Sequence, residues 1–179
     1  MRPHLRGCAH ASVRPTDTRL ICDAIGQELA GIPAETNNRA VSDARPRYTG
    51  GCLCGAVRYE AEGEPSLMGN CYCADCRKAS GSGFIPFMGF TSGTVRFSGV
   101  TRQFTSPAAS GRQAVRNSCP VCGSLVFGGR VGQDDSFTIY AGSLDDPSLF
   151  RPQVAIFTRG RPEWAVVPAG LKVYAGLPG

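Results

Sequence analysis

The sequence predicts a mainly β, antiparallel domain with few short helical turns, and three observations support this. The chain of 179 residues contains 23 Gly and 13 Pro, which divide it into short segments and disfavour long helices. Short runs of β-forming residues stand between these turn residues. Most of the cysteines gather into three tight groups, which is typical of a fold stabilised by metal.

The first 47 residues differ in composition from the rest. They carry basic, acidic and proline residues with little periodic apolar pattern, apart from one short helix expected at 18–29. We expect residues 1–47 to be an N-terminal extension, either poorly ordered or the result of a start site placed too far upstream. Residues 48–179 are expected to form a zinc-binding domain.

The elements of this domain follow from the spacing of apolar runs and turn residues. The predicted strands are, in chain order, 56–60, 83–90, 94–97, 102–105, 113–117, 124–127, 137–141, 154–157 and 165–167. A helix is predicted at 75–80, directly after the second cysteine group. Its N-terminus would carry partial positive charge beside the cysteines and favour their thiolate form.

Charge and hydropathy exclude several classes of protein. The net charge of +5 is spread along the chain without a concentrated basic stripe, so nothing points to a nucleic acid partner. No apolar stretch is long enough to span a bilayer, and the N-terminus lacks the apolar region of a secretory signal. We therefore expect a cytoplasmic protein that does not associate with membranes.

The nine cysteines are an odd number and too clustered for a spread disulfide framework. Seven of them form the three groups: Cys52 and Cys54; Cys71, Cys73 and Cys76; Cys119 and Cys122. Seven thiolates divide as four plus three, because four make a full structural zinc site and three leave one coordination position open. The three that lie within six residues can wrap one metal, which leaves Cys52, Cys54, Cys119 and Cys122 for a structural zinc. The sequence thus predicts two zinc ions per chain.

Other interpretations of these cysteines stay open. Cys71, Cys73 and Cys76 can also belong to a second structural site that Asp75 or a distant side chain completes. Cys119 and Cys122 can form a redox pair, although no βαβ pattern surrounds them. The only histidines, His4 and His10, lie in the N-terminal stretch together with Cys8 and Cys22, which are most simply free thiols.

Three stretches of this sequence resemble one family. They are GCLCGAVR at 51–58, NCYCADCRKASG at 70–81 and NSCPVCG at 117–123, joined by AGSLDDP at 141–147 and the region around Trp164. In this order and spacing they resemble the glutathione-dependent formaldehyde-activating enzymes, a family that includes the relatives of centromere protein V. The resemblance covers about two thirds of the chain and is specific, since it rests on three cysteine groups rather than on one.

The resemblance implies a β-tent zinc fold. It implies a structural zinc on Cys52, Cys54, Cys119 and Cys122, and a second, reactive zinc on Cys71, Cys73 and Cys76. The implied activity is that of a carbon-sulfur lyase working in the synthetic direction, which condenses glutathione or a similar thiol with formaldehyde or another small aldehyde. A non-catalytic zinc module that binds a protein or nucleic acid is the alternative.

Candidate substrate contacts follow from position alone. Arg77 and Lys78 come directly after Cys76 and can hold the carboxylates of glutathione, or they can be a solvated basic pair. Trp164 and three phenylalanines, Phe84, Phe87 and Phe90, can form a wall of the pocket or part of the core. The family often has His where this chain has Tyr72, so the role of that position here is an open question.

Overall fold

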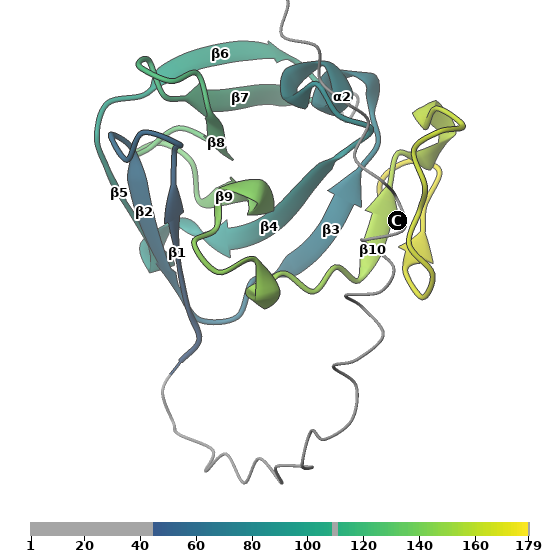
Figure 1. Cartoon of the computed structure of the whole chain (residues 1–179), viewed down its shortest axis with the longest axis horizontal. Helices are drawn as coiled ribbons and strands as arrows, with labels where there is room; N and C mark the ends of the chain where they lie inside the picture. Colours follow the sequence, from purple (N-terminus) through teal and green to yellow (C-terminus); the bar gives the residue numbers. More distant parts are fainter. Residues whose placement is uncertain (1–44, 109–110, 179) are drawn as a thin grey trace, which may run out of the picture. The chain divides into compact units, whose positions relative to one another are not determined.

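The computed structural model describes residues 45–108 and 111–178, shown in Figure 1. Strands dominate this part, which confirms the mainly β prediction. The predictions for the first 44 residues lie outside the described residues. They include the N-terminal extension, the helix at 18–29, Cys8 and Cys22.

A small antiparallel sheet holds the first strands of the domain. Its spatial order is β1 (Arg47–Gly51), β2 (Arg58–Glu62) and β5 (Val95–Ser98). Strand β1 pairs with β2 through five residues, from Arg47 opposite Glu62 to Gly51 opposite Arg58. This pairing sets the position of the turn that follows β1, where the first cysteine group lies.

A second sheet of eight strands forms the rest of the framework (Figure 1). Its strands are, in spatial order, β11 (Lys172–Val173), β10 (Val154–Ile156), β3 (Leu67–Cys71), β4 (Ile85–Thr91), β9 (Ser136–Tyr140), β8 (Leu125–Gly128), β7 (Gln113–Ser118) and β6 (Arg102–Pro107). The pairs from β3 to β6 are antiparallel, as expected. Strand β10 instead runs parallel to both of its neighbours, β3 and β11.

Helical structure is short in the described part of the chain. The one α-helix there is α2 (Ala74–Ser80), which confirms the predicted helix at 75–80. Four single 3₁₀ turns complete the set: η1 (Ser92–Thr94), η2 (Ala141–Ser143), η3 (Pro147–Leu149) and η4 (Thr158–Gly160).

One predicted strand is wrong, and three observed strands have no predicted counterpart. The strand expected at 165–167 is wrong, because Pro162 and Pro168 bracket this segment and restrict its backbone, and it forms a bend and irregular chain instead. The prediction lacks β1, β3 and β11. Strand β3 gives no local signal, since Gly69 and Asn70 are poor strand formers. It forms because its neighbours β4 and β10 pair with it on both sides.

The two faces of the large sheet have different environments. One row of directly opposed residues crosses five strands and is buried in the main core: Met68, Met88, Ile139, Phe127 and Asn117. Since side chains alternate along a strand, the neighbours of these residues face the other way. That second face carries Cys71 opposite Ile85 and Phe87 opposite Tyr140. No helix of the described residues is long and apolar enough to cross a membrane.

Candidate metal centres and their cavity

Four cysteines from two distant turns meet in the structure. Cys52 and Cys54 follow β1, whereas Cys119 and Cys122 follow β7, and their sulfur atoms all lie within 4.8 Å of one another. The Sγ atoms of Cys52 and Cys54 are 3.6 Å apart, and those of Cys54 and Cys119 are 3.7 Å apart. A tetrahedral zinc with bonds of about 2.3 Å separates its sulfur ligands by about 3.8 Å. This set, called the four-cysteine cluster below, therefore fits zinc.

The turns of the four-cysteine cluster direct hydrogen-bond donors at the sulfur atoms. The backbone N–H of Val57 donates to Cys52 Sγ at 3.2 Å. Ser124 Oγ lies 3.3 Å from Cys122 Sγ, and hydrogen bonds from Ser124 lower the pKa of the Cys122 thiol to about 5. Gly55 and Gly123 end the two turns with positive φ angles of 79° and 74°, a conformation that favours glycine. Both turns are thus built to present thiolates.

The second cluster, called the three-cysteine cluster below, lies where β3 passes into α2. Cys71 is the last residue of β3, Cys73 is the N-cap of α2, and Cys76 lies in the first turn of the helix. Their sulfur atoms also lie within 4.8 Å of one another. Cys73 Sγ accepts a hydrogen bond from the backbone N–H of Cys76 at 3.3 Å. The predicted helix N-terminus beside the cysteines is confirmed.

The thiols of the three-cysteine cluster stabilise one thiolate among them. Hydrogen bonds from Cys71 and Cys76 lower the pKa of the Cys73 thiol. The pKa of the Cys71 thiol is raised, because Cys71 donates a hydrogen bond to Cys73 and this bond holds the Cys71 proton in place. Among the described residues no carboxylate or histidine joins the three sulfur atoms, and Asp75 lies outside the set. Within the described residues the cluster therefore offers three ligand atoms to a metal.

A cavity of about 650 Å³ opens beside the three-cysteine cluster. The second face of the large sheet forms its floor, through residues of β4, β7, β8 and β9. The strand side chains and glycines on this floor are Ile85, Phe87, Ala114, Arg116, Gly128, Ser136, Thr138 and Tyr140. Asp75 and the three cysteines line it at one end. A small molecule in this cavity would reach the open side of the cluster.

Three arginines line the cavity together with three aspartates, Asp75, Asp134 and Asp135. Arg130 is already paired, since its guanidinium lies 2.7 Å from the Asp134 carboxylate. Arg116 is only 8% exposed and donates from Nη1 to Ser106 Oγ at 3.1 Å. Arg112 is exposed and, within residues 45–108 and 111–178, pairs with no carboxylate. Arg112 is therefore a candidate contact for an anionic substrate.

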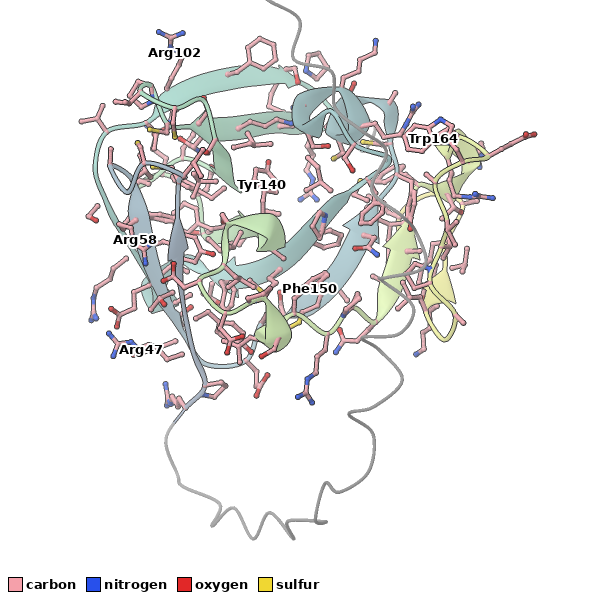
Figure 2. All side chains as sticks on the ribbon, in the orientation of Figure 1. Arg47, Arg58, Arg102, Tyr140, Phe150 and Trp164 are labelled. Atoms are coloured by element: carbon pink, nitrogen blue, oxygen red, sulfur yellow. The ribbon has the colours of Figure 1, made fainter. Side chains whose placement is uncertain are left out.

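The other predicted contacts lie in several places. Arg77 and Lys78 are on α2, and neither lines the cavity. Of the four aromatic candidates only Phe87 lines it, because Phe90 is in the core and Phe84 packs against Tyr72. Trp164 is 70% exposed. It lies on the C-terminal segment, where Figure 2 labels it.

Tyr72 lies outside the cavity although it stands between two ligands of the three-cysteine cluster. It is fully buried, and its hydroxyl donates to the Val166 carbonyl at 3.1 Å. Its side chain therefore serves packing on the far side of β3.

Sequence reasoning missed Arg112, Arg116 and Tyr140. A signal exists for Arg116, because a charged residue in the middle of the strand QAVRNS interrupts the apolar pattern and needs a reason to be there. No such signal marks Tyr140, which ends an ordinary β pattern. Its relation to the cysteines depends on the pairing of β9 with β4.

Comparison with known proteins identifies the family to which the chain belongs. The family model described as glutathione-dependent formaldehyde-activating enzyme matches residues 47–160. The chain belongs to this family. The glutathione-dependent formaldehyde-activating model thus covers both cysteine clusters, α2 and the floor of the cavity. It confirms the resemblance inferred from the cysteine groups.

A Rhodobacter sphaeroides protein of known crystal structure is similar to this member of the family. It is 20% identical, with a TM-score of 0.41 over 54% of this chain and 87% of the other. No curated protein matches the chain.

Proposed function

We propose that this protein is a zinc-dependent carbon-sulfur lyase that condenses glutathione, or a similar thiol, with formaldehyde or another small aldehyde to a hemithioacetal. The observation that carries the proposal is the three-cysteine cluster at the end of a cavity large enough for a peptide thiol. Family membership supports glutathione and formaldehyde as the substrates.

The two clusters would have different roles. Cys52, Cys54, Cys119 and Cys122 would hold a structural zinc, because four thiolates fill its coordination sphere. Cys71, Cys73 and Cys76 would hold a second zinc with a position open to the cavity. Bound there, zinc would lower the pKa of a substrate thiol and so supply the nucleophile at neutral pH. Two ions per chain and a domain of residues 48–179 are part of the proposal.

The cavity residues would orient the substrates. Arg112, which pairs with no carboxylate of the described residues, offers its guanidinium to a carboxylate of the thiol, a geometry that arginine suits. Arg77 and Lys78 stay candidates for the same task from α2. Ile85 and Phe87 on the floor of the cavity would shield the reacting thiolate from water. We place the activity in the cytoplasm, since reduced cysteine clusters suit a reducing compartment.

The test combines zinc counting with a rate measurement. Native mass spectrometry of the full chain should show two zinc ions, one of which carries the mass of glutathione after millimolar glutathione is added. Exchange between free glutathione and its formaldehyde adduct, followed by NMR, should be faster with the protein than without it. A chelator strong enough to remove the labile zinc should abolish the difference.

One result would contradict the enzyme proposal. Two tightly held zinc ions with no thiol adduct and no acceleration would indicate a non-catalytic zinc module instead.

A further inference from the structure

The hydroxyl of Tyr140 is positioned over the floor of the cavity. Tyr140 ends β9 and stands directly opposite Phe87 of β4, on the face of the sheet that also carries Cys71. The neighbouring strand has Gly128 on this face, where a side chain would meet the Tyr140 hydroxyl at 3.1 Å. The glycine therefore leaves space for the tyrosine, whose hydroxyl lies beside Gly128 of β8. Figure 2 labels Tyr140 close to the end of β8.

This hydroxyl is free to act on a ligand. It lines the cavity, and no side-chain hydrogen bond among the described residues involves it, since Ser143 Oγ donates to the Tyr140 backbone carbonyl instead. Burial raises the pKa of the Tyr140 hydroxyl well above its usual value, while Arg116 acts in the opposite direction. At neutral pH the group is thus a protonated donor that faces the cavity.

Arg116 lies on the same face, one strand further along. Arg116 stands opposite Gly128 on the neighbouring strand. Because glycine has no side chain, nothing from this position lies between Arg116 and Tyr140. The Arg116 guanidinium is buried and has no carboxylate partner among residues 45–108 and 111–178. Its Nη1 is hydrogen-bonded to the neutral Ser106 hydroxyl and the residue lines the cavity, so its charge is available to an anion formed there.

We propose that Tyr140 is the catalytic proton donor to the hemithioacetal oxygen and that Arg116 stabilises the phenolate left behind. This inference rests on the proposed function.

The chemical step balances without a further reactant. The thiolate sulfur forms a bond to the carbonyl carbon, and the π pair of the C=O bond moves to the oxygen. Tyr140 transfers its hydroxyl proton to that oxygen, which completes the S–CH₂–OH product when the aldehyde is formaldehyde. The proton that the thiol lost on ionisation then returns through water to the Tyr140 phenolate. The sum is the addition of one thiol to one aldehyde.

The test compares Tyr140→Phe with Tyr48→Phe in the zinc-loaded full chain. Tyr48 is a matched control, because it is buried in the core against Phe90 and lies outside the cavity. Tyr140→Phe should lower kcat by about 100-fold, a usual contribution of a proton donor, with the KM for the thiol unchanged. Tyr48→Phe should keep the kcat of the parent protein. Zinc content and the thiol adduct in native mass spectrometry should be the same in all three proteins.

The outcomes separate this inference from the proposed function. A parent protein that gives no acceleration overturns both. An active parent whose Tyr140→Phe variant keeps full kcat overturns the role of Tyr140 alone. If Tyr140→Phe does not fold, 3-fluorotyrosine at position 140 replaces it, because its phenol is more acidic at nearly the same size. A severalfold change in kcat then supports proton donation, and an unchanged kcat overturns it.

Discussion

Asp145 shows how one side chain holds the first cysteine turn to the rest of the domain. Its carboxylate accepts hydrogen bonds from Arg58 Nη1 at 2.9 Å and from Thr49 Oγ1 at 2.8 Å. Its backbone N–H donates to the Thr49 carbonyl at 3.0 Å. Because Thr49 and Arg58 lie on either side of Cys52 and Cys54, this contact fixes the hairpin that presents two thiolates.

The Asp145 contact should make stability depend on pH. The hydrogen bonds from Arg58 and Thr49 lower the pKa of the Asp145 carboxyl below its usual value. The stability that this gives is present above about pH 4 and is lost as pH falls through the lowered pKa. Asp145→Asn should therefore destabilise the protein at pH 7 by up to about 1 kcal/mol, the value of an exposed ion pair. The gap between the two proteins should close in acid.

Urea denaturation of both proteins at several pH values between 7 and 3 measures this gap. The cysteine clusters are common to both proteins, so their own acid sensitivity cancels in the difference. Glu62→Gln is the control, since its carboxylate lies 4.0 Å from Arg96 in an exposed pair. A gap that stays constant with pH would contradict the role assigned to the Asp145 carboxylate.

At the scale of elements, Arg112 differs from the basic residues of α2, because Arg112 lines the cavity and they do not. Helix α2 has no buried residue, and its basic residues Arg77 and Lys78 lie in its last turn. Arg112 precedes β7 and lines the cavity. A residue that lines the cavity can meet the thiol directly, whereas Lys78 would have to reach it from outside.

Arg112→Gln should raise the KM for glutathione by about tenfold, because a charge-assisted hydrogen bond to a carboxylate contributes about 1.5 kcal/mol. Lys78→Gln, the matched control on α2, should leave KM unchanged. Steady-state rates with glutathione and with an uncharged thiol of similar size measure both effects. The Arg112 effect should vanish with the uncharged thiol. A larger effect at Lys78 would instead favour the basic residues of α2 as the anchor.

The elements also show how far the sequence predicts this structure. Eight of the predicted strands overlap observed ones, because alternation and turn residues are local signals. Strand β3 and the parallel placement of β10 depend on partners distant in sequence, and no local pattern reports them. The cysteine sets are predictable because ligand spacing is local chemistry. Arg116 and Tyr140 come together only through the registers of β7, β8 and β9.

At the scale of the whole domain, the two cysteine clusters differ in how far apart their cysteines lie in the sequence. The four-cysteine cluster ties the turn after β1 to the turn after β7, 65 residues apart at Cys54 and Cys119. The three-cysteine cluster lies within six residues and closes no long loop. A metal bound in the four-cysteine cluster would therefore contribute to folding, since it would join the more distant segments of the chain.

This difference predicts the effects of two serine substitutions. Cys119→Ser should lower the melting temperature and the soluble yield, whereas Cys73→Ser should keep the melting temperature within a few degrees and abolish activity. Differential scanning fluorimetry, zinc analysis and the exchange assay measure these effects together. Equal unfolding of both variants would contradict the division into a structural and a reactive site.

The two faces of the large sheet have a consequence for how relatives of this protein can change substrate. Along β9, and at Phe87 and Met88 of β4, successive residues alternate between the core and the cavity floor. A substitution at Phe87 or Thr138 would reshape the floor, while Met88 and Ile139 beside them keep the core unchanged. New specificity could thus accumulate during evolution without loss of the fold, and a library that varies only the cavity-facing positions would reproduce that history in the laboratory.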